Sequence, residues 1–447
     1  MFLEIETNTK NKELKVKLQS NNEEKDNSNN NNHQTKNSDT HSKTEIELND
    51  LNSFQKSGSV SNEKDIEQND SEHKKSGFRV TSVQRTPCHL YLSVPKNLSS
   101  EMIIIFHTAK ELKGKPQVKF GENNSPDYNL NNIGQSYEVS YDNNRWIHYV
   151  GLTGLTPNTE YKFIAGDSKD NKNWSKEKNF RTSRSYLTDD QLTFVVGADV
   201  NVVDESIEMA KMMSNYDPDF VAIGGDIALS NGNKYCYRKW DQFLDNWHNS
   251  AVHNNRLIPI MPVIGNHEVM EGYRYKTEPD TKKAPFFFTL FQQDANIKKD
   301  PFDQKPYRVH HISENLAITP LDTHHIYTEN EQIDFMNDNY QKLRDDNVKH
   351  IIPIYHIPAY PSDKEYSVSS STRVRTFWTD LFDIYKIKLA FEGHSHLLKK
   401  TKPLYGGKAV DQNKGTIFLG DGAWGRLRDS REDGVLRWYE EYISSTR

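Results

Sequence analysis

The chain has 447 residues, enough for two or three domains, and its 57 basic and 63 acidic residues give a net charge of −6. No concentrated basic stretch predicts a nucleic-acid surface, and no apolar run approaches the length of a membrane span. Cys88 and Cys236 are too few for a disulfide framework. The first residues carry acids where a signal peptide has an apolar core, so we expect a cytoplasmic protein. The sequence leaves the oligomeric state open.

Residues 1–77 form a segment of distinct composition, rich in Asn, Ser, Lys, Glu and Asp. So little apolar surface does not offset the entropy of ordering, and we therefore expect a disordered tail. A regulated interaction tail is the functional alternative. One weak counter-signal is an apolar alternation compatible with a short strand, at Phe2, Leu3, Ile5, Leu14, Val16 and Leu18.

Residues 78–184 contain short apolar runs separated by turn clusters, a pattern typical of an all-β sandwich. None of these runs ends on converging acids or histidines, so we expect a scaffold rather than a catalytic domain. The segment Leu152–Phe163 resembles the loop and strand of a fibronectin type III domain, in which a tyrosine anchors a corner. We expect seven strands, at Val80–Val83, His89–Val94, Met102–Thr108, Gln117–Gly121, Trp146–Leu152, Tyr161–Asp167 and Lys178–Arg181.

Residues 190–430 alternate strand-like runs with amphipathic stretches, which predicts an α/β domain. In the first such stretch Val203, Ile207, Ala210 and Met213 share one face, as in a helix packed on a core. Residues 431–447 are treated as a separate C-terminal segment. We expect helices at Val203–Tyr216, Tyr235–Trp247, Gln332–Leu343 and Val374–Tyr385.

Polar side chains follow five of the strand-like runs, at the point where each run ends. The run Phe220–Gly225, for example, stops on Asp226. Because the carboxyl ends of strands in open α/β sheets face one crevice, we expect these side chains to converge. A single such residue is usually a helix cap, a turn residue or a core histidine, but five together favour a shared site. The runs end on Asp199, Asp226, Asn266 with His267, His356, and His394 with His396.

These carboxylates, amide and imidazoles make a ligand set suited to Fe, Mn or Zn rather than to calcium alone. We interpret them as a two-metal site, with Asp226 as the bridge between ions about 3.5–4 Å apart. Such a site can neutralise a phosphate ester, hold its oxygens in line and supply hydroxide at neutral pH.

The same blocks resemble those of the calcineurin-like metallophosphoesterases, and within that family the purple acid phosphatases with their N-terminal fibronectin-like domain. The resemblance covers residues 78–426 and implies an α/β/β/α metallophosphoesterase sandwich. It extends to the ending Gly420-Asp421-Gly422-Ala423, which is similar to the closing strand and loop of the family. Its main blocks are Gly-Ala-Asp199-Val-Asn201, Gly225-Asp226-Ile-Ala-Leu229, Gly265-Asn266-His267-Glu268, Tyr-His356 and Gly393-His394-Ser-His396.

The resemblance implies a role for each residue of these blocks. His267 is the expected acid that protonates the leaving alkoxide, and Glu268 is expected to orient or support it. The expected ligands of the first metal are Asp199, Asp226 and His396, and those of the second are Asp226, Asn266, His356 and His394.

Two departures from the family pattern concern the first metal. Purple acid phosphatases have a tyrosine whose phenolate binds ferric iron where this chain has Leu229, so we expect no tyrosinate–ferric site and no purple colour. Other metallophosphoesterases have a histidine where this chain has Asn201, whose amide is a weaker possible ligand. We expect two divalent or mixed-valence ions of Fe, Mn or Zn, the first of them labile.

The expected reaction is hydrolysis of phosphate monoesters by metal-bound hydroxide, with His267 as general acid. A phosphodiesterase of the same fold is one alternative, and a non-catalytic binding protein with a degenerate metal site is another. The histidines that help bind phosphate in several plant members have no counterpart between Ile357 and Phe391. Arg373 and Arg375 are the candidates for that role, Arg373 first.

Overall fold

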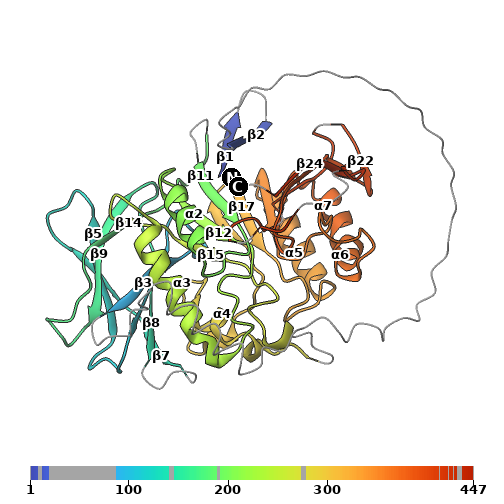
Figure 1. Cartoon of the computed structure of the whole chain (residues 1–447). Helices are drawn as coiled ribbons and strands as arrows, with labels where there is room; N and C mark the ends of the chain where they lie inside the picture. The colour runs from blue at the N-terminus through green and yellow to red at the C-terminus, as the bar shows by residue number, and fades with distance from the viewer. Residues whose placement is uncertain are drawn as a thin grey trace, which may run out of the picture.

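The computed structural model of the chain (Figure 1) describes residues 2–8, 13–19, 87–139, 145–188, 192–272, 278–411, 413–420, 422–425, 427–429 and 435–445. The expected strand at Val80–Val83 lies outside these residues. None of the helices in the described ranges has the length and apolar character needed to span a bilayer. Cys88 and Cys236 are not disulfide-bonded.

The N-terminal domain is the expected β-sandwich. One sheet holds β3 (Cys88–Ser93), β4 (Met102–Thr108), β8 (Trp146–Leu152) and β7 (Gln135–Glu138). The other holds β10 (Lys178–Arg181), β9 (Glu160–Asp167), β5 (Pro116–Glu122) and β6 (Leu130–Ile133).

Alternate residues of both sheets fill the space between them, among them Leu92, Ile104, Phe163 and Phe180. Tyr161 closes the corner expected from the fibronectin-like segment, since its hydroxyl accepts a hydrogen bond from the Thr156 amide at 2.9 Å.

Both sheets of the sandwich continue into the second domain. Strands β11 (Leu192–Gly197), β12 (Phe220–Ile223) and β15 (Ile260–Pro262) are parallel, and β15 joins β3 through the pair Ile260 and Ser93. Strand β10 likewise pairs with β14 (Arg256–Leu257), which pairs with β13 (Val252–His253). The two domains are therefore joined by backbone hydrogen bonds as well as by the chain.

Buried ion pairs reinforce this junction. Helix α3 (Tyr237–Ser250) packs on β3 and presents Asp241, which pairs with Arg145 and with His89. His89 also contacts Asp245 at 3.0 Å. Burial alone would lower the pKa of His89, but these two carboxylates raise it. A scaffold attached in this way holds its position against the α/β domain.

The second sheet of the α/β domain is mixed. Its order is β16 (His310–Ser313), β17 (Leu316–Pro320), β18 (His350–Ile354), β19 (Leu389–Glu392), β23 (Ile417–Gly420), β20 (Leu398–Thr401) and β24 (Glu440–Ser444). A small hairpin of β21 (Leu404–Tyr405) and β22 (Lys408–Ala409) lies between β20 and β23 in the chain. Strand β24 comes from the segment 431–447 that we set apart, so part of that segment belongs to the domain.

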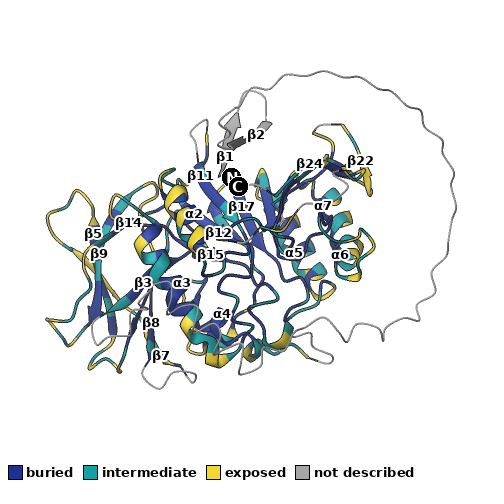
Figure 2. Cartoon of the chain, in the orientation of Figure 1, coloured by how far each residue is buried: buried dark blue, intermediate teal, exposed yellow. Residues whose placement is uncertain are grey.

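The two sheets pack face to face, and helices cover their outer faces (Figures 1 and 2). Phe194 of β11 contacts Phe391 of β19 edge to face, with ring centroids 6.4 Å apart. Helices α2 (Asp204–Ser214) and α3 bury apolar faces on the first sheet. Helix α5 (Glu331–Asp345) and the run α6 (Ser369–Val374), η5 (Arg375–Thr379) and α7 (Asp380–Ile384) cover the second. This confirms the α/β/β/α architecture.

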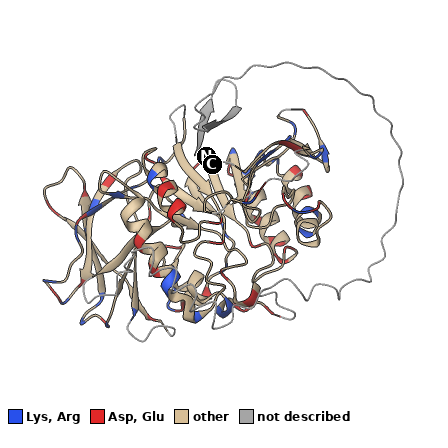
Figure 3. Ribbon diagram, viewed as in Figure 1, with Lys and Arg blue, Asp and Glu red and all other residues tan. Residues whose placement is uncertain are grey.

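The helix expected at Tyr235–Trp247 begins with a short turn, η1 (Lys234–Cys236), which leads into α3. Four short elements were not expected from sequence: η2 (Met270–Gly272), η3 (Thr281–Lys283), α4 (Pro285–Leu290) and η4 (Pro301–Asp303). The helix expected at Val374–Tyr385 begins already at Ser369 and contains the π-helical turn η5. In the view of Figure 3, basic and acidic residues are both scattered over the described elements of the two domains.

The start of the chain departs from the expected disordered tail. Strands β1 (Phe2–Asn8) and β2 (Glu13–Gln19) form a hairpin, and β1 adds to the edge of the first sheet through Ile5 and Leu192 of β11. The sheet edge supplies hydrogen-bonding partners that composition does not reveal. Residues 20–77 lie outside the described part of the chain.

Candidate metal centre

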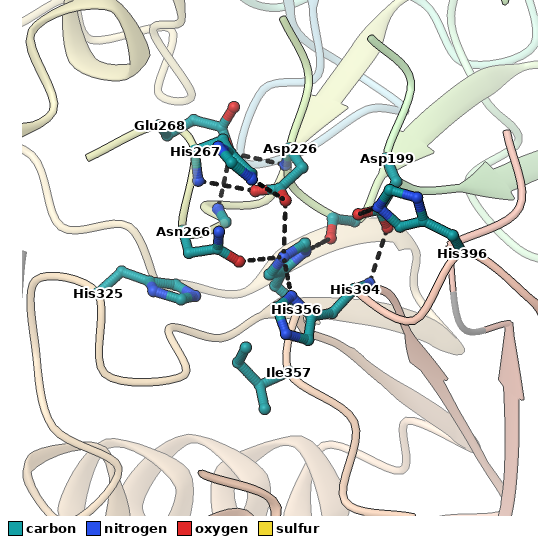
Figure 4. Close-up of polar contacts among 12 residues, drawn as sticks. Asp199, Asp226, Asn266, His267, Glu268, His325, His356, Ile357, His394 and His396 are labelled. Atoms are coloured by element: carbon teal, nitrogen blue, oxygen red, sulfur yellow. Dashed lines mark hydrogen bonds and ion pairs between the residues drawn. The ribbon is translucent and has the colours of Figure 1, made fainter. Parts of the chain in front are cut away.

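The strand ends of both sheets meet at one rim (Figure 4). Asp199, Asp226 and Asn266 follow β11, β12 and β15 of the first sheet, and His356 and His394 follow β18 and β19 of the second. The ligand atoms of Asp226, His356 and His394 all lie within 4.8 Å of one another. The residues predicted to share a site do lie together.

His356 is the hub of the cluster. Its Nε2 lies 3.0 Å from Asn266 Oδ1, 3.2 Å from His394 Nδ1 and 3.3 Å from Asp226 Oδ2. Its Nδ1 donates to the Gly224 carbonyl at 2.8 Å. That bond fixes the ring and, in the neutral tautomer, leaves the lone pair on Nε2 facing the other three side chains.

A second group forms around Asp199. Its Oδ2 accepts a hydrogen bond from the His394 amide at 2.7 Å, and its Oδ1 lies 3.1 Å from His396 Nε2. Asp199 Oδ1 is buried, so its contact with the His396 ring is made away from water. In Figure 4 His396 and Asp199 lie on one side of His356, with Asn266 on the other.

The backbone at these positions is unusual. Asp199, Asp226, His394 and His396 have φ values of 59°, 54°, 80° and 60°, in the left-handed region that non-glycine residues rarely adopt. Such conformations gather at functional sites, where the surrounding structure holds them. Gly422 makes the approach possible, because a Cβ there would lie 2.0 Å from Asp199 Oδ2.

Glu268 links the loop after β12 to the loop after β15 through hydrogen bonds. It is fully buried, and its carboxylate accepts hydrogen bonds from the amides of Gly265, Asp226 and Ile227 at 2.7–2.8 Å. Burial and the charge of Asp226 raise the pKa of Glu268 to about 8. Glu268 therefore supports the backbone that presents Asp226 and Asn266, rather than His267 itself.

His267 stands at the rim with 39% of its side chain exposed. Its amide donates to Asp226 Oδ1 at 2.8 Å, and its Nε2 lies 3.8 Å from Asp226 Oδ2. Its Nδ1 is hydrogen-bonded to Asn231 Oδ1, a partner that the sequence did not indicate. Because Asn231 holds Nδ1, the other ring nitrogen, Nε2, faces Asp226 and the other proposed ligands.

The pKa values in the cluster are shifted by burial and by the charges of neighbouring side chains. Burial alone would raise the pKa of Asp226, but His356 holds it below its usual range. Asp226 in turn raises the pKa of His356 to about 9, against the effect of burial. Burial raises the pKa of Asp199, and burial together with the charges of His356 and Lys364 lowers that of His394.

These residues fit a pair of divalent cations. The donor set contains carboxylate, amide and imidazole atoms, which is the chemistry that Fe, Mn and Zn prefer. The crowding of three polar atoms around the buried His356 Nε2 is costly without a cation.

Three residues considered from sequence are directed elsewhere. Asn201 Oδ1 accepts from the Val202 amide at 2.8 Å, and Asn201 lines a small hollow with Ser206 and Trp424. Its role as a metal ligand stays a prediction. Arg373 donates to Glu329 at 3.2 Å, and Arg375 donates to the backbone carbonyls of Ala359 and Tyr366, so both guanidinium groups are engaged by the protein.

Two residues near the cluster were missed. His325 is buried, contacts the ring of His356 with centroids 5.7 Å apart and pairs with Thr323 Oγ1 at 3.1 Å. The apolar run Leu316–Leu321 that ends on Asp322 was the available signal, since it repeats the pattern of the other strands. Lys364 has its Nζ 2.5 Å from His394 Nε2 and lies in a loop without periodicity.

Family comparisons agree with this architecture. Residues 87–182 match the model of the purple acid phosphatase N-terminal domain, and residues 200–398 match that of the calcineurin-like phosphoesterases. Residues 200–398 are therefore a calcineurin-like phosphoesterase domain. The sandwich before it is a purple acid phosphatase N-terminal domain, so the order of domains is similar to that of purple acid phosphatases.

The individual relatives are distant. An uncharacterized protein of Mycobacterium tuberculosis is 24% identical over 352 residues, covering 72% of this chain and 63% of its own length. Purple acid phosphatase 21 of Arabidopsis thaliana is 21% identical over 336 residues, covering 75% and 70%. The chain thus spans less than two thirds of the mycobacterial relative. The structure of purple acid phosphatase PPD1 from yellow lupin shares the fold, with a TM-score of 0.65 and 18% identity over 81% of this chain and 68% of that one.

Proposed function

We propose that this protein is a binuclear metal-dependent phosphohydrolase that acts on phosphate monoesters. The observation that carries the proposal is the position of His356 Nε2, within 3.3 Å of donor atoms from Asp226, Asn266 and His394. The proposed ligands are Asp199, Asp226 and His396 for one cation, and Asp226, Asn266, His356 and His394 for the other.

Each group of residues has a distinct task in the proposed reaction. Two bound cations would neutralise the phosphoryl oxygens and lower the pKa of a water molecule to about 7. Asp226 belongs to both proposed ligand sets, and hydrogen bonds hold it in place. The His267 amide donates to its carboxylate, and its own amide donates to Glu268. Glu268 thus preorganises the loops, so little rearrangement is needed when charge develops on the substrate.

His267 supplies the leaving-group proton in this proposal. Asn231 Oδ1 accepts the proton on Nδ1, so the proton on Nε2 of the imidazolium is the one available to a leaving alkoxide. The partly exposed position of the ring lets it reach a substrate that enters from solvent. After transfer the neutral ring keeps its Nδ1 bond to Asn231.

One observation favours the non-catalytic alternative. The Asn201 amide oxygen is bonded to the Val202 amide and Leu229 stands in the tyrosine position, which leaves Asp199, Asp226 and His396 as the strong ligands for the first cation among the described residues. Three strong ligands are still enough for a catalytic site that keeps open positions. We therefore place hydrolysis first.

The test is hydrolysis of 4-nitrophenyl phosphate and bis(4-nitrophenyl) phosphate by metal-loaded protein. The proposal predicts a higher kcat/KM for the monoester, abolished in Asp226→Asn and kept in the control Asp411→Asn, whose exposed carboxylate pairs only locally with Lys414. A preference for the diester would favour the phosphodiesterase. Metal binding without turnover of either ester would favour the binding protein.

A further inference from the structure

The loop 224–233, between β12 and η1, carries the hydrogen-bond partner of His267. That partner is Asn231, whose Oδ1 is bonded to Nδ1 of the His267 ring. The residue before it, Ser230, is buried and accepts a hydrogen bond from the indole Nε1 of Trp240 at 2.9 Å. Trp240 belongs to α3 and is buried as well. One side chain of α3 therefore holds the backbone that presents Asn231.

Further contacts hold the same loop. Lys239, which precedes Trp240 in α3, donates from Nζ to the Leu229 carbonyl at 3.0 Å. Gly232 is packed so closely that a Cβ there would overlap the backbone of Met270. The loop therefore has little room to shift by itself, and its position follows that of α3.

The sandwich domain in turn fixes α3. Arg145 lies just before β8 of the sandwich, and Asp241 follows Trp240 in α3. The two side chains are buried and paired twice, with Nη1 2.6 Å from Oδ1 and Nη2 2.8 Å from Oδ2. A bidentate pair of this kind fixes orientation as well as distance.

A second path from the sandwich reaches the same residue through aromatic rings. Tyr91 of β3 lies edge to face with Phe291, with ring centroids 6.1 Å apart, and Phe291 lies edge to face with Trp240 at 6.0 Å. The Tyr91 hydroxyl also donates to the Leu290 carbonyl at 2.7 Å. These rings are buried, and a close-packed interior transmits displacements of its side chains. Trp240 is the point at which this path meets the loop.

We propose that Trp240 is a positioning residue for His267, and that the sandwich domain acts on the reaction through it. The inference deepens the proposed function and rests on it for the role of His267. Trp240 acts through Ser230 and Asn231, because it fixes the loop whose amide oxygen directs the imidazole ring. A general acid has to lie within hydrogen-bond distance of the leaving oxygen, so a small displacement of the ring lowers the rate.

Two single substitutions remove the last link of this path. Trp240→Phe keeps a buried ring without the indole N–H, and Ser230→Ala removes the acceptor without disturbing the ring. Each should lower kcat for phenyl phosphate about tenfold, the upper range for one neutral hydrogen bond, with metal content unchanged. The double variant should be little worse than either alone. Trp174→Phe breaks a similar bond to the Asp170 carbonyl within the sandwich and should behave as the wild type.

The leaving group separates a displaced acid from general damage to the protein. Phenol has a pKa close to that of tyrosine, about 10, and 4-nitrophenol is more acidic. Phenyl phosphate therefore depends more on the leaving-group proton than 4-nitrophenyl phosphate does. Trp240→Phe and Ser230→Ala should lose a larger factor in kcat on phenyl phosphate. Equal losses on the two esters, or loss of metal in either variant, would overturn the inference.

Hydrogen–deuterium exchange of the metal-free full chain tests the positioning without requiring turnover. The Asn233 amide is bonded to the Ser230 carbonyl at 3.0 Å and reports on the loop. Relative to the amides of β12, it should exchange about tenfold faster in Trp240→Phe. It should exchange at the wild-type rate in Trp174→Phe. Unchanged exchange in Trp240→Phe would overturn the inference.

The double variant Arg145→Met/Asp241→Leu tests the contribution of the sandwich. It replaces the buried charge pair by apolar side chains, a change that buried ion pairs often tolerate. The Asn233 amide should again exchange faster relative to β12, and an unchanged rate would overturn the claim that the sandwich acts on the loop. Wild-type protein that hydrolyses neither ester, with faster exchange in this variant and in Trp240→Phe, would refute the proposed function and support the positioning of the loop.

Discussion

Substitution of Gly422 by alanine isolates the backbone geometry that holds Asp199. The new Cβ would lie 2.0 Å from Asp199 Oδ2 and 2.9 Å from the His394 amide, so it must break the hydrogen bond between them. Loss of that charged hydrogen bond costs about 1.5–3 kcal/mol. The left-handed φ of 92° adds about 1–2 kcal/mol for alanine.

Gly154 is the matched control. Its φ is 70°, and a Cβ there meets nothing within 4 Å, so Gly154→Ala carries the backbone strain alone. We expect Gly422→Ala to be less stable than Gly154→Ala by about 1.5–3 kcal/mol in urea unfolding of the metal-free proteins. It should also retain less metal after dialysis, because Asp199 is displaced. Equal stability and equal metal content in the two variants would refute the claim that a Cβ at position 422 displaces Asp199.

Two further predictions concern proton positions. His267→Ala should lower kcat for the aryl monoester about 10²- to 10⁴-fold with metal content unchanged, and loss of metal along with activity would contradict the role of His267. Asp226 raises the pKa of His356 to about 9, so a cation must displace this proton. Metal affinity of chelator-treated protein should therefore rise about tenfold per unit as pH increases toward 9, with proton release visible by calorimetry in buffers of different ionisation enthalpy. A pH-independent affinity between pH 6 and 8 would contradict it.

The sequence predicted the parts of the site that follow strand periodicity. Apolar runs that stop on Asp226 or His356 place those residues at strand ends, and the packing of parallel strands then brings them together. A glycine of the same blocks is explained by close packing, because a Cβ at Gly225 would lie 2.6 Å from His356 Nδ1. The two-sheet architecture followed from the alternation of strands and helices and from the family resemblance.

The other features of the site depend on where side chains point, and the local sequence does not determine that. Asn201 occupies a plausible ligand position, yet its amide oxygen turns to the Val202 amide. Arg373 directly precedes the helix expected at Val374–Tyr385, but Glu329 engages it from a distant loop. Lys364 lies in an irregular loop, and that loop is held by long-range contacts such as the hydrogen bond from the Ala359 amide to Glu392.

The number of cations bound per chain tests the central claim most directly. Elemental analysis at equilibrium with free metal should find two in the wild type, about one in Asp199→Asn, and fewer than one in Asp226→Asn, whose carboxylate serves both ions in this account. Wild-type protein without stoichiometric metal, or Asp226→Asn with two ions retained, would contradict it.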